Sequence, residues 1–271
     1  MSNVLIPPKN YDEPSVFFPE NLLREARRQK SLPNQSVPEI CLLDPDGDIV
    51  RFLVSTNQGI KDPAWACYHT DLYVFEHGGF QFGVVGCAVG ASFAVLVAEE
   101  LFASNCKLMV SITSAGQITA TRNPPYFILI DKALRDEGTS HHYLPSSDYS
   151  NIDERLLTSL TNSLVTSSIP VIIGATWTTD APFRETESAI NHSRTLGILA
   201  VEMEASALYA FAQAKHKPVI CLAHVTNQMA SIEGDFEKGI ANGSQDALQL
   251  LAAIANMWQN DSNSNPKAIE G

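Results

Sequence analysis

The segment Val201-Glu202-Met203-Glu204-Ala205-Ser206 places two carboxylates around a methionine, directly after the apolar run 196–201. Leu208, Phe211 and Ala212 then recur at helical spacing, which predicts that the two acids lie where a strand turns into a helix. Open α/β sheets bind ligands at the carboxyl ends of their strands. An ionised glutamate there can accept both protons of a cis-diol such as a ribose. Taken alone, two acids at a helix start equally fit a favourable interaction with the helix dipole.

The flanking residues favour the sugar site, because the segment resembles the ribose-binding motif of the nucleoside phosphorylase superfamily. That superfamily holds purine nucleoside phosphorylases, uridine phosphorylases and related nucleosidases. Three more segments resemble it in the family's order: the strand and glycine-rich loop 82–92, the helix segment 98–101 and the strand 111–118. The resemblance covers residues 39–258. It implies a single-domain α/β fold, a three-layer sandwich with a mixed, twisted central sheet flanked by helices.

The rest of the chain divides around this domain. Residues 1–38 are punctuated by Pro and Asn and predict an N-terminal arm with one helix from Glu20 to Lys30. Residues 259–271 form a polar tail that we expect to be disordered. Within the domain, the apolar runs predict buried strands, a hairpin and a last helix; these are strands 40–43, 107–113, 126–130, 171–176 and 218–225, hairpin 71–87, and helix 244–258.

The amino-acid composition and charge indicate which binding partners and which cellular compartment suit this chain. The net charge of −12 disfavours nucleic acid and anionic membranes, which both favour basic patches. No apolar run is long enough to span a bilayer, and no signal peptide is visible. The cysteines are odd in number and lack Cys-x-x-Cys spacing, which predicts buried free thiols in a reducing cytoplasm. They are Cys41, Cys67, Cys87, Cys106 and Cys221.

The resemblance assigns a sugar side and a base side to the site. Met203 and Glu204 would hold the ribose, with Glu202 nearby and His142 from the pair His141-His142. Asn227 would face the base, and an amide that donates and accepts suits a 6-oxopurine or a pyrimidine better than adenine. The remaining base-side candidates are Ser114, Ala115, Gly116, Phe183 and Arg184.

Two expectations concern metals and neighbouring chains. The adjacent histidines have no third ligand at a recognisable spacing, so we expect neither a metal nor a cofactor, with inorganic phosphate as a possible co-substrate. The resemblance implies that His69 is lent to the neighbouring subunit's site, and an ordinary surface histidine is the alternative interpretation. The resemblance therefore implies a homo-oligomer, a dimer or a hexamer.

The sequence departs from the family at the phosphate site. Phosphorylases of this superfamily carry Gly-Asp-Pro-x-Arg in the first loop, and Gly47 stands here in the place of that arginine. Asp44 and Asp46 bring negative charge to the same loop, where they either shape a turn or activate a water. An anion site could be rebuilt by Arg51 or by Arg24, Arg27 or Arg28 of a neighbour's arm. The remaining phosphate or water site candidates are Gly86, Cys87, Gly90, Ser111 and Thr113.

The resemblance thus implies an enzyme that cleaves the N-glycosidic bond of a nucleoside. Family membership alone points to phosphorolysis of a 6-oxopurine nucleoside or uridine. The family's phosphate-binding arginines would fall at Gly47, near Tyr68 or His69, and near Ser111, and none of these positions holds an arginine. Their absence leaves a hydrolytic nucleosidase as an alternative. A second alternative is a non-catalytic nucleoside-binding or storage protein.

Overall fold

One mixed sheet organises the chain. The computed structural model describes residues 9–164, 169–229 and 233–264, and in those ranges the sheet has ten strands. Their order is β10-β6-β8-β9-β5-β1-β4-β3-β2, with β7 paired to β6. The strands are β1 (Ile40–Asp44), β2 (Ile60–Lys61), β3 (Leu72–His77), β4 (Phe80–Gly86), β5 (Leu108–Gln117), β6 (Tyr126–Asp136), β7 (Tyr149–Asn151), β8 (Val171–Thr179), β9 (Ala200–Glu202) and β10 (Val219–Asn227).

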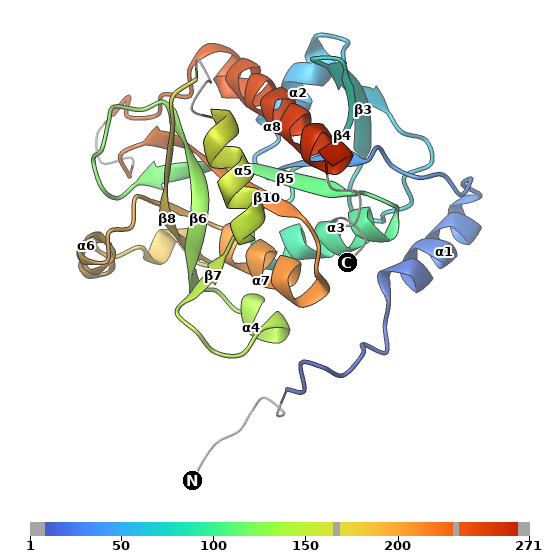
Figure 1. Cartoon of the computed structure of the whole chain (residues 1–271), viewed down its shortest axis with the longest axis horizontal. Coiled ribbons are helices and arrows are strands. Elements are labelled where there is room, and N and C mark those ends of the chain that lie inside the picture. The colour runs from blue at the N-terminus through green and yellow to red at the C-terminus, as the bar shows by residue number, and fades with distance from the viewer. Residues whose placement is uncertain (1–8, 165–168, 230–232, 265–271) are drawn as a thin grey trace.

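Helices cover both faces of this sheet and make the expected three layers. In Figure 1, α3, α4 and α7 lie below the sheet, whereas α2, α5 and α8 lie above it. Contacts agree, because α7 packs on α3 and α4 while α8 packs on α2 and α5. The helices are α1 (Pro19–Lys30), α2 (Asp48–Ser55), α3 (Ala91–Ala103), α4 (Ser140–Tyr143), α5 (Glu154–Leu164), α6 (Glu187–Thr195), α7 (Ala205–Lys215) and α8 (Ser244–Ser264), with 3-10 turns η1 (Pro182–Arg184) and η2 (Ile240–Gly243).

Strand β5 is the junction of the fold. It pairs parallel to β10 on one side, and on the other side it changes neighbour along its length. Ile40–Leu43 of β1 pair with β5 only as far as Ser111, and β9 takes over only at Gly116. Residues 112–115 therefore keep one edge without a strand partner. Such a switch in strand order is where open α/β sheets bind ligands.

The β5–β10 pairing also closes a ring of strands. β5, β9, β8, β6 and β10 pair in succession and return to β5, while β1, β4, β3 and β2 extend from it as an open sheet. All nine residues of β10 and all five of β1 are buried, as expected for parallel strands covered on both faces. Tyr209 ties α7 to this ring, since its hydroxyl donates to Ile130 O at 2.6 Å and accepts from Cys221 N at 3.1 Å.

The predicted elements are found, and some of their limits differ. The hairpin of β3 and β4 is confirmed, and β5, β6, β8 and β10 continue past their apolar runs into polar residues. The last helix was expected to end at Trp258, but it continues to Ser264 because neither glycine nor proline interrupts the chain before Pro266. Residues 259–264 of the expected disordered tail are thus helical, and 265–271 lie outside the described residues. No helix in the described ranges is long and apolar enough to cross a membrane.

The expected N-terminal arm carries a packed helix. Leu23 and Ala26 of α1 are buried in a small cluster with Ala66, and α1 packs on α3. Lys30 Nζ donates to Cys67 O at 2.7 Å. Residues 1–8 lie outside the described residues, so the arm's first part is not placed.

Candidate active site

Glu204 lies at the start of α7 with one carboxylate oxygen unmatched. Its Oε1 accepts the Gly90 N–H at 2.7 Å, whereas Oε2 is buried and makes no hydrogen bond of good geometry with a described residue, although the Thr113 hydroxyl lies close enough to lower the pKa of Glu204. The side chain is 1% exposed, and burial together with the negative charge of Glu202 raises its pKa to about 8. Buried polar atoms are nearly always paired. The unmatched oxygen therefore fits a ligand with a hydroxyl, such as a sugar, which can accept from the protonated acid or donate to the carboxylate.

Glu202 has a different place from the one expected. Its Oε1 accepts the hydroxyls of Thr176 and Thr178, at 3.1 and 2.5 Å. Its Oε2 accepts the backbone N–H groups of Glu204 and Ala205, both at 2.7 Å. These N–H groups are the ones that a helix start leaves without partners. Glu202 thus caps α7 and holds the Glu204 backbone in place, rather than facing a sugar itself, and Met203 between them is half-buried.

Asp44 at the end of β1 shapes the turn into α2. Its Oδ1 accepts Gly47 N at 3.1 Å and its Oδ2 accepts Val50 N at 2.9 Å. Gly47 has a φ of +76°, and a Cβ there would lie 2.5 Å from Cys87 Sγ. Burial raises the pKa of Asp44 to about 7, and the charges of Asp46 and Asp48 add to this rise. With both oxygens used by the turn, Asp44 is not the residue that meets a nucleophile.

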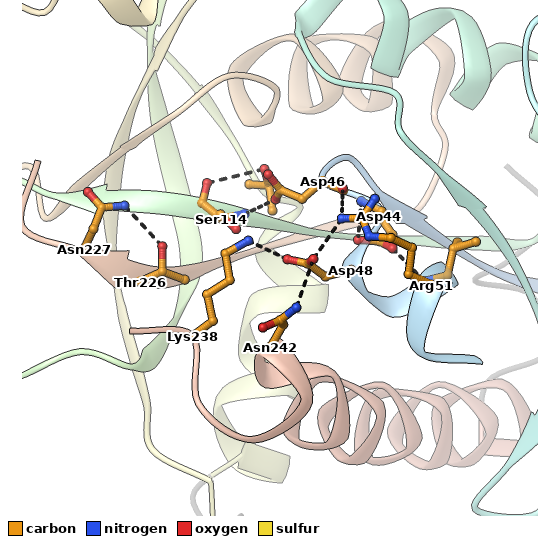
Figure 2. Close-up of polar contacts among 12 residues, drawn as sticks. Asp44, Asp46, Asp48, Arg51, Ser114, Thr226, Asn227, Lys238 and Asn242 are labelled. Atoms are coloured by element: carbon orange, nitrogen blue, oxygen red, sulfur yellow. Dashed lines mark hydrogen bonds and ion pairs between the residues drawn. The ribbon is translucent and has the colours of Figure 1, made fainter. Parts of the chain in front are cut away.

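Asp46 reaches from the same turn to the open edge of β5. Its Oδ2 accepts the Ser114 N–H at 2.6 Å, and Ser114 lies in the part of β5 that lacks a strand partner on that side (Figure 2). The charge of Asp46 also makes a small contribution to the raised pKa of Glu204. Asp46 is therefore the catalytic candidate of the pair predicted from sequence.

Two cations near this turn are paired to one acid. Figure 2 shows Asp48 between Arg51 and Lys238, whose nitrogens lie 2.8 and 2.5 Å from its carboxylate. Burial opposes ionisation, but hydrogen bonds from Lys238 and Arg51 hold the pKa of Asp48 below its ordinary value. Arg51 also donates to Asp46 O at 2.7 Å. Sequence reasoning missed Lys238, because a lysine in a polar loop carries no motif.

The glycine-rich loop after β4 faces the same turn. Cys87 N donates to Asp44 O at 3.0 Å and Gly90 N donates to Glu204, so two of the loop's N–H groups are already used. Arg51 Nη1 lies 3.9 Å from the exposed Cys87 Sγ and 2.8 Å from the position of a Cβ on Gly47. Arg51 thus places a guanidinium beside the position where the family's arginine is missing. Three other predicted members of this site frame it: Gly86 packs against Val50, Thr113 is buried, and Ser111 is buried with no partner for its hydroxyl in the described chain.

The predicted base side gathers around Asn227 at the end of β10. Asn227 Oδ1 accepts Met229 N at 2.9 Å and Nδ2 donates to Thr226 Oγ1 at 3.2 Å. The register places Asn227 opposite Gly116 and His224 opposite Ser114, with Ala115 buried between them. A Cβ on Gly116 would lie 2.8 Å from Met229 Sδ. The absence of a side chain at 116 therefore lets Met229 and the Asn227 amide pack closely against β5.

Four predicted residues lie away from Asp46, Glu204 and Asn227. Phe183 is 99% exposed, and neither it nor the exposed Arg184 makes a side-chain hydrogen bond or ion pair with a described residue. His142 is exposed in α4. His69 is exposed and its ring meets Phe93 edge-on at 6.4 Å. In the single chain, none of the four contacts Asp46 or Glu204.

A polar pocket opens beside Asp46. The groups that give it its polarity are Asp44, Asp46, Asp48, Thr113, His224 and Asn242. Sequence reasoning missed His224, because a histidine inside an apolar strand reads as part of the core. No set of three or more His, Cys, Asp or Glu side chains suited to a metal ion is found in the described residues.

Comparisons with known proteins show the family to which the chain belongs. Residues 40–256 match the Phosphorylase superfamily. The chain is 27% identical over 160 residues to a DeoD-type purine nucleoside phosphorylase of Aliivibrio fischeri, covering 58% of this chain and 67% of that protein. It is 24% identical over 141 residues to a guanosine phosphorylase of Halorubrum lacusprofundi, covering 52% of this chain and 58% of that protein.

Solved structures show the same fold. A uridine phosphorylase from Vibrio fischeri ES114 superposes with a TM-score of 0.68 at 19% identity, over 85% of this chain and 96% of that one.

Proposed function

Because the chain belongs to the phosphorylase superfamily, we propose that it is an enzyme that cleaves the N-glycosidic bond of a nucleoside. The observation that carries the proposal is the unmatched Oε2 of Glu204, 1% exposed at the start of α7. A buried carboxyl oxygen without a hydrogen-bond partner costs free energy that a bound sugar hydroxyl would recover. A storage protein would have no use for that arrangement, which argues against the non-catalytic alternative.

We infer that the base is a 6-oxopurine or uracil. Asn227 has one lone pair on Oδ1 and one N–H on Nδ2 left after its two bonds within the chain. These can pair with a ring N–H and a neighbouring carbonyl. Adenine lacks that carbonyl, so it makes a poorer partner.

Water is the acceptor that the site favours. The Ser114 N–H, which would otherwise face an incoming anion, already binds the Asp46 carboxylate at 2.6 Å. Arg51 and Lys238 are both paired to Asp48. A phosphate dianion would have to displace one carboxylate and separate two ion pairs, and two like unit charges 4 Å apart repel by about 4 kcal/mol at an effective dielectric of 20.

The reaction then follows from the placement of the groups. Glu204 holds the sugar hydroxyls while positive charge develops on the ring, as in glycoside hydrolysis. The water oxygen bonds to the anomeric carbon as the C–N bond breaks, and the electron pair of the C–N bond leaves with the base. Asp46 accepts the proton from the water and returns it to the base, so the products are free sugar and neutral base. No cofactor takes part in this scheme.

Phosphorolysis is the second candidate, and Arg51 is the observation that favours it. Its guanidinium lies beside Gly47 and Cys87, and guanidinium is the side chain best suited to phosphate. If Arg51 leaves Asp48 when phosphate arrives, it would take the role of the family's missing arginine.

Product identity separates these candidates. The protein is incubated with inosine, guanosine, uridine and adenosine, with and without phosphate, and the sugar product is identified by mass. We expect free ribose, formed at a rate that added phosphate does not change. Strict phosphate dependence with ribose 1-phosphate as product would support the second candidate, and no cleavage of any nucleoside would overturn the proposed function.

Assembly and location complete the proposal. His142, Phe183 and the loop with His69 are exposed in the single chain, which suits surfaces that a second copy covers. We propose a homo-oligomer, a dimer or a hexamer, in which His69 faces a neighbour's site. All five cysteines are free thiols, which fits a reducing cytoplasm.

A further inference from the structure

His224 lies inside β10 without a hydrogen-bond partner. The residue is 7% exposed, its ring stacks on Phe127 at 4.5 Å with planes 10° apart, and neither ring nitrogen bonds any described residue. A buried imidazole carries one donor and one acceptor. Neither nitrogen is fully closed off from solvent, so the ring can bind a small molecule that enters the polar pocket it lines.

The surrounding backbone makes room for this ring. A Cβ on Gly243 would lie 2.2 Å from His224 Cε1 and 2.9 Å from each ring nitrogen, and Gly243 has a φ of +76°. No side chain larger than hydrogen fits at 243 without displacing the imidazole. The start of α8 is therefore built around His224.

The ring lines the same polar pocket as Asp46. The charged groups around it are Asp46 and Asp48 from the turn after β1, and Lys238 from the loop after β10. Burial and the nearby Lys238 lower the pKa of His224 to about 4, so the ring is neutral near pH 7. A neutral imidazole and a carboxylate thus face one small polar space from two sides.

We propose that this pocket holds the reacting water and that His224 is the residue that positions it. This inference rests on the proposed hydrolysis. The water donates one hydrogen to Asp46 and one to the unprotonated nitrogen of His224, which leaves an oxygen lone pair for the anomeric carbon. When the C–O bond forms, the proton passes to Asp46 and the C–N electron pair leaves with the base. His224 keeps its own proton count throughout.

The test compares two replacements of His224 in the full-length protein. His224→Phe keeps the ring stacked on Phe127 and removes both nitrogens, whereas His224→Gln keeps a donor and an acceptor. His192→Phe, at an exposed histidine of α6, is the matched control. Nucleoside affinity is measured by calorimetry, and turnover by release of base.

We expect His224→Phe to lose at least tenfold in kcat with nucleoside affinity within twofold of the unaltered protein. His224→Gln should recover a substantial part of that loss, and His192→Phe should change neither quantity. If His224→Phe does not fold, the result for His224→Gln decides. Glutamine keeps a donor and an acceptor, so turnover by His224→Gln below one hundredth of that of the unaltered protein would contradict water positioning by hydrogen bonds. Unchanged turnover in His224→Phe, or equal losses of affinity and turnover, would overturn the inference. Failure of the unaltered protein to cleave any nucleoside would instead count against the proposed function.

Discussion

At the scale of single residues, Glu204 carries the strongest prediction. Glu204→Ala should lower kcat/KM for a nucleoside about tenfold or more, because a buried sugar hydroxyl left without its hydrogen-bond partner costs about 1–3 kcal/mol. Glu187→Ala, at an exposed position of α6, serves as the control in the same steady-state assay. Near-normal turnover by Glu204→Ala would contradict the sugar clamp.

The same residue makes stability depend on pH. Burial raises the folded-state pKa of Glu204 to about 8, so the stability linked to its neutral form is present at pH 4 and is lost as pH rises through 8. Glu204→Gln should therefore increase the free energy of unfolding at pH 9 by on the order of a few kcal/mol, which raises the melting temperature. At pH 5 the same substitution should change the melting temperature little. Thermal unfolding at both pH values checks this, and an equal shift at both would contradict it.

Asn227 predicts the order of substrates. Inosine, guanosine or uridine should be cleaved faster than adenosine, since only these bases offer a carbonyl beside a ring N–H. Asn227→Asp should shift preference toward a base that can be protonated on a ring nitrogen. Relative kcat/KM values for the four nucleosides give the answer, and a preference for adenosine by the unaltered protein would rule the assignment out.

Sequence predicted these residues unevenly. Glu204 and Asn227 belong to contiguous motifs at strand ends, and both lie in the cluster. His224, Lys238 and Asp48 take their places from contacts between segments far apart in the chain, and the pairing of Lys238 with Asp48 joins positions that no local pattern connects. Glu202 belongs to the motif but caps α7 instead, because its four donors lie within the protein.

At the scale of elements, the turn between β1 and α2 depends on Gly47. Gly47→Ala should destabilise the fold by roughly 1–3 kcal/mol, because φ is +76° and the new Cβ would contact Cys87 Sγ. Gly79→Ala is a matched control, since its φ is +85° with nothing within 4 Å of the added carbon. Urea unfolding measures both. A loss at Gly47 no greater than at Gly79 would show that the contact with Cys87 is unimportant.

Elements were predicted better than their ends. Buried apolar runs located β1, β5, β6, β8 and β10, since parallel strands covered on both faces carry continuous apolar sequence. The polar end of β8 was missed because there the strand approaches the site and loses that pattern, whereas the polar end of β5 was located only through the family resemblance of residues 111–118. The apolar run 196–201 located β9 as a strand before a helix, but only Ala200–Glu202 of that region form the strand.

At the scale of the whole molecule, we predict a closed homo-oligomer in which His69 serves a neighbour. Light scattering should give a mass that is a multiple of the 29.5 kDa chain. His69→Ala should lower turnover while that mass stays the same. A fully active monomer at high dilution would contradict the shared site.

The ring of strands lay beyond the reach of the sequence. Its closure depends on β5 and β10, which are separated by about a hundred residues and pair through backbone groups common to all residues. Family resemblance implied the sheet and its helices, but not the gap in pairing between Ser111 and Gly116. That gap is what exposes the Ser114 N–H to Asp46.

Cys87 gives this molecule a built-in attachment point for a spectroscopic label. It is the one exposed thiol of the five, all of which lie in the described residues, and it stands beside Arg51 at the mouth of the candidate site. A maleimide dye would therefore react there selectively, without engineered cysteines. The fluorescence emission of the attached dye would respond to movement of the Arg51 side chain. Binding of nucleoside or phosphate can therefore be followed by fluorescence titration before any product is formed.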